Sequence, residues 1–217
     1  WLSLDHWKKI AFFLYIMVLT HGIPLDWTHG PLLFTRTFDP AKTLTGRPTD
    51  LEACRKTLQH YHDIGSIRAL PDQSATDGVW SAFFPVPKKG TDKIRGCIHV
   101  NTINPYLQYE HFKMEGLHTI QAQLHRRDHM WKVDMSDFYM HLLIAEADHL
   151  YFRFQFEGIK YECLAMPFGL GPAPRIATKF LLPAIRYLRR RQVRRMAYID
   201  DVIGIARSTL QAIRNAQ

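Results

Sequence analysis

The sequence predicts an α+β protein with an antiparallel sheet. Runs of apolar and β-branched residues occur in pairs around short polar or glycine-containing tips, which is typical of β-hairpins. A stretch at 173–192 has the apolar spacing of a helix. Strands and helices do not alternate in the β-α-β order that a parallel sheet requires.

The chain has 217 residues, of which 47% are hydrophobic and 22% are charged, so it can bury a sizeable core and is not expected to be disordered. Its net charge is +8, which favours a polyanionic partner, with nucleic acid first; a basic protein without such a partner is the alternative. The three cysteines have no metal-ligand spacing and form no disulfide framework, so a reducing compartment is expected, not a secreted protein.

Residues 1–48 are rich in aromatic side chains and lead into a loop at 37–50. The longest apolar run, 10–19, is too short to cross a bilayer, which takes roughly 20 residues, and no signal-cleavage site follows it. We therefore predict a buried helix or strand there and no membrane partner.

A helix is predicted next, with Thr49 and Glu52 as a capping box and Gly65 as its stop. Its buried side would carry Leu51, Leu58, Tyr61 and Ile64.

The remaining elements follow from turn signals and apolar spacing. The helix at 173–192 contains Pro183, so a kink or register break is expected within it. The others are a hairpin at 79–100 with a basic tip at 88–93, a short helix at 116–124, a strand from 130 that turns by 139, a hairpin at 150–165 around Glu157-Gly158, and a last hairpin at 194–206.

Two adjacent acids, Asp200 and Asp201, stand between the apolar halves of the last hairpin. A charged turn is the simple interpretation. However, Asp134 ends another strand-like run, and acids at two strand ends could converge on Mg²⁺, which binds one or two protein carboxylates together with substrate phosphates.

Five stretches match one family in its order: "FFPVPKKGTDKIRGCIHVNTIN" (83–104), "HFKME" (111–115), "DMSDFY" (134–139), "MPFGLGPAP" (166–174) and "YIDD" (198–201). With them the chain resembles reverse transcriptases, and most closely those of DIRS-type, tyrosine-recombinase retrotransposons.

The resemblance implies the polymerase right-hand fold, with fingers and a palm on an antiparallel sheet and with the thumb absent. Residues 1–48 would be an N-terminal extension packing on the fingers, residues 49–130 mainly fingers, and residues 131–217 mainly palm, ending before the primer grip and thumb.

The resemblance also implies site residues. Asp134 and Asp200 would bridge two Mg²⁺ (or Mn²⁺) ions with the backbone carbonyl of Met135, and Asp201 would support them. Tyr139 would be the steric gate against a ribose 2′-hydroxyl. The remaining dNTP-binding residues would be the cations Lys88 and Arg95, which grip the triphosphate, and Phe168 and Gly169, which lie against the nucleotide and template.

An arginine cluster lies between 186 and 195. Arg189, Arg190, Arg191 and Arg194 would contact template or primer phosphates. Capping of the preceding helix, or a solvated face, is the alternative.

The activity implied is RNA-directed DNA synthesis, with an RNA template, a DNA or RNA primer and dNTPs as partners, in the nucleus or cytoplasm. Gly96, His99 and Asn101 depart from the fingers pattern. These departures keep a second hypothesis open, a catalytically inactive nucleic-acid-binding remnant. An RNA polymerase of the same architecture is a third, which Tyr139 disfavours.

Overall fold

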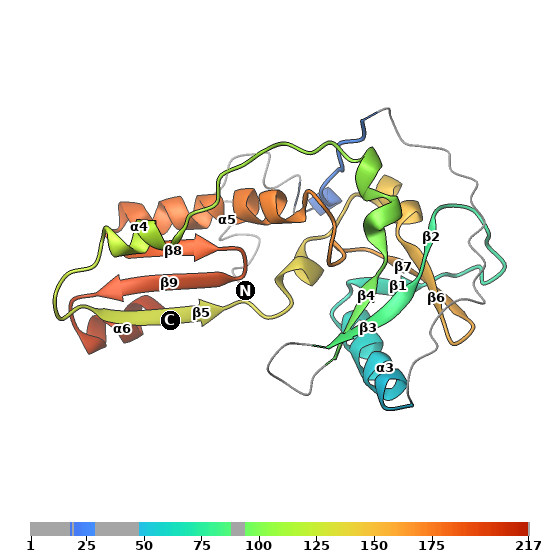
Figure 1. Cartoon of the computed structure of the whole chain (residues 1–217), viewed down its shortest axis with the longest axis horizontal. Helices are drawn as coiled ribbons and strands as arrows, with labels where there is room; N and C mark the ends of the chain where they lie inside the picture. Colours follow the sequence, from blue (N-terminus) through green and yellow to red (C-terminus); the bar gives the residue numbers. More distant parts are fainter. Residues whose placement is uncertain (1–17, 19, 29–47, 88–93, 217) are drawn as a thin grey trace. The chain divides into compact units, whose positions relative to one another are not determined.

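A computed structural model describes residues 18, 20–28, 48–87 and 94–216 (Figure 1). The chain forms two compact units. Unit 1 comprises the described parts of 1–18, 110–138 and 174–217, and unit 2 comprises the described parts of 19–109 and 139–173. Neither unit is one continuous segment of the chain.

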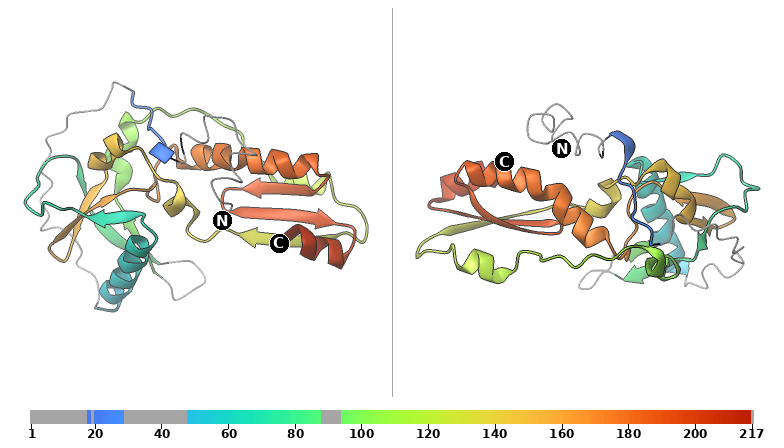
Figure 2. Two further views of the ribbon diagram at one scale, coloured as in Figure 1. Left: turned by 180° about the vertical axis from the view of Figure 1, so that it is seen from behind. Right: turned by 90° about the horizontal axis from the view of Figure 1, so that it is seen from above.

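Unit 1 is built on a three-stranded antiparallel sheet in the order β5-β9-β8 (Figure 2). Its strands are β5 (His129–Asp134), β8 (Arg194–Tyr198) and β9 (Asp201–Ala206). β8 and β9 form the predicted last hairpin, and β5 is the predicted strand from residue 130, so both predictions are confirmed.

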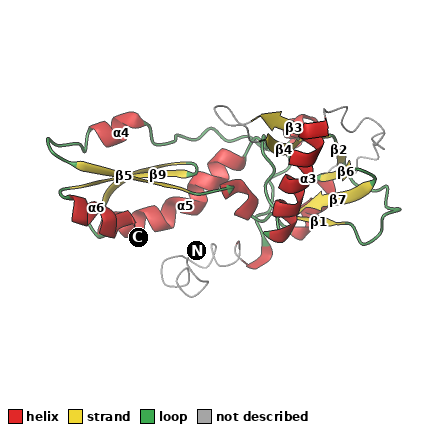
Figure 3. Cartoon of the chain, turned by 90° about the horizontal axis from the view of Figure 1, so that it is seen from below, coloured by secondary structure: helices red, strands yellow, loops and turns green. Residues whose placement is uncertain are grey.

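Helices cover both faces of this sheet. α4 (Leu117–Gln121) lies on one face, and α5 (Ala173–Arg190) and α6 (Thr209–Ala216) lie on the other (Figure 3). The α4 face has a core of Ile120, Met196 and Ile205. Since side chains alternate along a strand, one face of the hairpin is buried under α4 and the other under α5.

α5 buries one side of its length, through Ala177, Phe180, Leu181 and Ile185. These positions recur every three to four residues, as an amphipathic helix requires. The helix continues through Pro183 to Arg190 and does not end there.

The β5–β9 register depends on a close contact between Trp131 and Gly204, which are directly opposite each other. A Cβ atom at position 204 would lie 2.0 Å from Cε2 of the Trp131 indole. No side chain other than hydrogen therefore fits under this ring, which explains a glycine in the middle of a strand.

Unit 2 contains α3 (Pro48–Asp63), which buries Cys54, Leu58 and Tyr61. The helix already includes Pro48, so the predicted capping box with Thr49 as its cap is wrong. Proline is favoured in the first turn because its φ is preset for a helix and its missing N–H needs no partner there. The predicted stop is confirmed, since Gly65 has φ +72°.

Unit 2 contains a four-stranded sheet in the order β1-β7-β6-β2. β6 and β7 form the predicted hairpin, and its turn residues Glu157 and Gly158 both have positive φ, +48° and +83°, as a two-residue type I′ turn requires. The strands are β1 (Ile67–Ala69), β2 (Trp80–Ser81), β6 (Arg153–Phe156) and β7 (Ile159–Cys163).

A second hairpin of unit 2 pairs β3 (Phe83–Pro87) with β4 (Ile94–Ile98), as predicted for 79–100. Its tip, 88–93, lies outside the described residues. Two 3₁₀ turns follow the hairpin, η2 (Val100–Thr102) and η3 (Asn104–Tyr106), and a third, η4 (Phe138–His141), follows β5.

The prediction of a strand from residue 150 is wrong at its start, because 146–151 form the 3₁₀ helix η5 (Glu146–Tyr151). The buried carboxylate of Asp148 explains the difference. It accepts hydrogen bonds from the Leu25 N–H and from Trp27 Nε1, both at 2.9 Å. This long-range contact holds the segment against 20–28, the described part of the N-terminal stretch. The described residues contain no helix that is both long and apolar enough to cross a membrane.

Gly204→Ala should destabilise unit 1 by about 1–3 kcal/mol, because the added methyl group overpacks the site under Trp131. Urea unfolding would measure the loss. In a Trp131→Leu background the same substitution should cost much less. An equal cost in both backgrounds would show that the indole is not what excludes a side chain at 204.

Candidate active site

The three acids singled out in the sequence lie at one end of the unit 1 sheet. Asp134, the last residue of β5, is the direct register partner of Asp201, the first residue of β9. Asp200 lies in the β8–β9 turn, and its carbonyl oxygen accepts a hydrogen bond of 2.9 Å from the Met135 N–H. Ladder pairing and this turn contact bring together strand ends that are more than 60 residues apart in the sequence.

The turn between β8 and β9 is short and strained. Tyr198 and Asp201 are register partners, and only Ile199 and Asp200 lie between them. Ile199 has φ +54°, a left-handed conformation that β-branched residues rarely adopt. Strain of this kind persists only where the surrounding structure imposes it, and it concentrates at functional sites.

A cation on the neighbouring strand faces the acids. The Nζ of Lys132 lies 2.8 Å from Oδ1 of Asp201. The Asp201 carboxylate, followed by the charges of Asp134 and Asp200, raises the pKa of Lys132 above its ordinary value. All three carboxylates therefore lie near enough to act on one ammonium group.

Three of the predicted dNTP-binding residues meet in unit 2. The guanidinium of Arg95 lies 5.5 Å from the ring centroid of Phe168, and the rings of Tyr139 and Phe168 meet edge to face at 5.9 Å. Gly169 follows with φ +89°, so a residue with a side chain would be strained there. The structure thus brings together Arg95, Tyr139 and Phe168; Lys88 lies outside the described residues.

Asn104 holds the turn that carries Phe168. Its side-chain amide donates to the Gly169 carbonyl at 3.0 Å, and its Oδ1 accepts from the Gly171 N–H at 2.8 Å. The sequence interpretation gave Asn104 no role. The available signal was its position as the last residue of the fingers motif, directly before Pro105.

The chain matches the family described as "Reverse transcriptase (RNA-dependent DNA polymerase)" over residues 84–217. The chain belongs to the reverse transcriptase family.

Curated relatives of this reverse transcriptase chain are retroviral and retrotransposon polyproteins. It is 23% identical over 194 residues to the Gag-Pro-Pol polyprotein of sheep pulmonary adenomatosis virus, covering 85% of the chain and 10% of the polyprotein. It is 28% identical over 137 residues to the retrovirus-related Pol polyprotein from transposon gypsy of Drosophila melanogaster. This match covers 60% of the chain and 13% of the polyprotein. The chain thus spans roughly a tenth of their length.

Among solved structures, the foamy viral protease-reverse transcriptase in complex with dsDNA is similar to this chain, with a TM-score of 0.68 at 14% identity. The match covers 90% of this chain and 39% of the other. At this identity the likeness shows a shared polymerase fold.

Reverse transcriptases generally use divalent metal ions, and the chemistry of the acids fits such an ion. Among the described residues no group of three or more His, Cys, Asp or Glu side chains is placed so that it could hold a metal ion. Mg²⁺ does not need such a group, because it keeps several waters and binds one or two carboxylates with substrate phosphates. The exposed Asp134, with Asp200 in the adjoining turn and the Met135 carbonyl nearby in sequence, is an oxygen donor set of that type.

The arginine cluster of the chain divides into two groups. Arg189 forms an ion pair with Glu115, and Arg194 forms a two-pronged ion pair with Asp128, with N–O distances of 2.7 and 2.9 Å. Arg190 and Arg191 are exposed. The structure thus gives Arg189 and Arg194 acidic partners inside unit 1, which neither interpretation of the sequence included, while phosphate binding by all four stays a prediction.

Glu115 closes the free edge of the unit 1 sheet. Its carboxylate accepts the Ala197 N–H at 3.2 Å and binds Arg189, whose guanidinium also reaches the Arg195 carbonyl at 3.4 Å. β8 is an edge strand, so these side chains satisfy backbone groups that would otherwise be open. The sequence interpretation used Glu115 only as part of the "HFKME" motif and missed this role.

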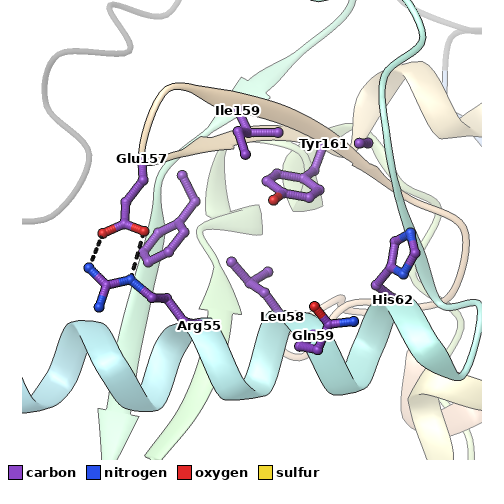
Figure 4. Close-up of a pocket in the computed structure, with 9 residues that line it drawn as sticks. Arg55, Leu58, Gln59, His62, Glu157, Ile159 and Tyr161 are labelled. Atoms are coloured by element: carbon purple, nitrogen blue, oxygen red, sulfur yellow. Dashed lines mark hydrogen bonds and ion pairs between the residues drawn. The ribbon is translucent and has the colours of Figure 1, made fainter.

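A separate cavity of about 370 Å³ lies in unit 2 between α3 and the β6–β7 hairpin (Figure 4). Leu58, Ile159 and Tyr161 form its apolar walls, and the Arg55–Glu157 ion pair closes one end. None of the predicted site residues lines it.

The ion pair between Asp128 and Arg194 should make the stability of unit 1 depend on pH. The Asp128 side chain is only 1% exposed, and Arg194, the His125 N–H and Arg207 hold its pKa well below the ordinary 3.8. A depressed carboxyl pKa stabilises the folded state above pH 3.8, and this contribution is lost as the pH falls towards the folded pKa.

The Asp128→Asn variant should therefore melt below the parent at pH 7 and pH 5, and the difference should narrow below pH 4. Thermal melts across this range would measure it, with the exposed Asp26→Asn as the matched control. A difference that is the same at pH 7 and at pH 3 would contradict the charged pair as its cause.

Proposed function

We propose that this chain is the fingers and palm of an RNA-directed DNA polymerase of a retroelement, with unit 1 in the role of the palm. The observation that carries the proposal is the pairing of Asp134 with Asp201, with Asp200 in the adjoining turn. Membership of the reverse transcriptase family supports the same activity. The "HFKME" and "YIDD" motifs make a DIRS-type element, acting in the nucleus or cytoplasm, the specific form of this proposal.

In the proposed reaction a primer 3′-hydroxyl attacks the α-phosphorus of a dNTP and pyrophosphate leaves. Asp134 and Asp200, with the Met135 carbonyl, would hold two Mg²⁺ or Mn²⁺ ions, which when bound lower the pKa of the attacking hydroxyl and stabilise the leaving oxygens. Asp200 lies in the strained β8–β9 turn, at the end of the sheet where Asp134 pairs with Asp201. Asp201 is paired with Lys132, which suits a supporting role.

Unit 2 would bind the incoming nucleotide. The exposed guanidinium of Arg95 offers paired donors to a triphosphate. The half-buried Tyr139 ring, supported by Phe168, would stand where a ribose 2′-hydroxyl would have to fit. RNA template and primer would meet exposed cations such as Arg190 and Arg191.

A catalytically inactive nucleic-acid-binding remnant is the second candidate, favoured by the departures at Gly96, His99 and Asn101. A salt titration of primer–template binding separates the two. The polymerase should bind more tightly when a matching dNTP and Mg²⁺ are added, whereas the remnant should show the salt dependence alone.

Asp200→Asn should reduce primer extension on an RNA template by about a hundredfold or more, because metal stabilisation of the transition state supplies several kcal/mol and each 1.36 kcal/mol is tenfold. The assay would use the longest reading frame that contains the chain. The exposed Asp72→Asn is the control and should extend normally. Extension by Asp200→Asn at the control's rate would refute the assignment of Asp200.

Tyr139→Val should lower the preference for dNTP over rNTP by about ten- to a hundredfold, because the smaller side chain leaves room for a 2′-hydroxyl. Single-nucleotide incorporation of matched dNTP and rNTP measures the ratio. Tyr109→Val, at a position 68% exposed, is the matched control. Equal incorporation of dNTP and rNTP by the parent would contradict the steric-gate role of Tyr139 and would favour the RNA polymerase hypothesis.

A further inference from the structure

Lys132 shares one face of the sheet with two of the acids. It precedes Asp134 by two residues on β5, and Asp134 pairs with Asp201. Residues two apart on a strand point the same way, and diagonal neighbours across a ladder lie within reach of a long side chain. The Lys132 Nζ uses this diagonal to reach Asp201 Oδ1 at 2.8 Å.

The contact is an ion pair with one particular oxygen atom of Asp201. The Asp201 side chain is 31% exposed, yet its Oδ1 atom is buried, and that is the atom that Lys132 approaches. The Lys132 side chain is 55% exposed, so its position is not forced by packing. Electrostatic attraction to the acids is the physical reason for its direction.

The charge count of the cluster explains what this contact does. Asp134, Asp200 and Asp201 place three like charges at one sheet end, and such charges repel. The Lys132 ammonium lies 2.8 Å from Asp201 Oδ1 and shares the sheet face that carries Asp134. One ammonium therefore offsets part of the repulsion and is bound to one of the three acids.

We propose that Lys132 is a positioning residue: it holds Asp201 aside as an internal countercharge and thereby weakens the affinity of the acid cluster for divalent cations. The proposal rests on the proposed function, because that function makes Asp134 and Asp200 the metal ligands. It adds a reason why the second acid of the "YIDD" motif supports the site and does not bind metal.

Two effects should follow from neutralising Lys132. The negative potential at Asp134 and Asp200 rises because a positive charge is lost, and Asp201 is released to act as a further oxygen ligand. Both effects increase the affinity for a divalent ion. Without metal, the same change leaves the carboxylates unbalanced and lowers the stability of unit 1.

The experiment measures Mn²⁺ binding to the 217-residue chain by the EPR signal of free Mn²⁺, and thermal melting in EDTA, both at low ionic strength. Lys132→Met should bind Mn²⁺ about three- to tenfold more tightly than the parent. In EDTA it should melt roughly 2 °C lower. In Mn²⁺ the two proteins should differ less.

A double-mutant cycle separates the two effects. In an Asp201→Asn background, Lys132→Met should increase Mn²⁺ affinity less than in the parent, because no ligand is released. Lys132→Arg keeps the charge and should resemble the parent. Lys56→Met is the matched control, since Lys56 also pairs with a carboxylate, Glu52 at 3.5 Å, but in unit 2; it should leave Mn²⁺ affinity unchanged.

Unchanged or weaker Mn²⁺ binding by Lys132→Met, relative to Lys56→Met, would overturn the proposal. A melting temperature in EDTA equal to the parent's would also overturn it. Failure of the proposed function gives a different result. If Asp134 is not a metal ligand, Asp134→Asn should leave Mn²⁺ binding by the parent unchanged. The melts in EDTA would still test whether Lys132 is a countercharge.

Discussion

The register between β5 and β9 is the constraint on which the rest of unit 1 depends, and the Trp131–Gly204 contact fixes it. Because side chains alternate along a strand, a slip of one residue would turn Asp134 and its neighbours to the opposite face. Such a slip would also place a side chain under the indole in place of Gly204, where a Cβ would lie 2.0 Å from the ring. An apolar contact on the α5 face thus determines that Asp134 faces Asp201 on the other.

The positive charge of the chain serves structure as well as any partner. Arg194 is bound to Asp128, Arg189 to Glu115, and Arg195 is 1% exposed with a hydrogen bond of 3.1 Å to the Ile185 carbonyl. Burial lowers the pKa of Arg195 to about 10, which leaves it charged at neutral pH. A run of arginines in the sequence therefore overstates the charge offered to nucleic acid, and only the exposed members of the run match that interpretation.

The sequence predicted those features that local chemistry determines. Glu157-Gly158, Gly65 and the apolar runs around Asp200 carry their turn and strand signals within a few residues, and the corresponding elements are present. Features set by distant residues could not be read in this way. The η5 turn depends on Asp148 binding Leu25 and Trp27 across more than 120 residues, and the edge role of Glu115 depends on a strand some 80 residues later. The discontinuous units reflect the same long-range pairing.

The departures from the fingers pattern are compatible with a functioning hairpin. At Gly96 a Cβ would lie 2.3 Å from the Phe83 ring, which in turn stacks on Phe154 at 5.1 Å, so the missing proline is replaced by an aromatic packing that needs a glycine. His99 is exposed, and its backbone N–H donates to the Ala82 carbonyl at 2.8 Å; Asn101 is exposed as well. None of these positions lies in unit 1, which carries the three acids. All three acids, Asp134, Asp200 and Asp201, are present, and Asp201 is paired with Lys132. The departures in the fingers pattern therefore remove none of the residues that the catalytic proposal needs.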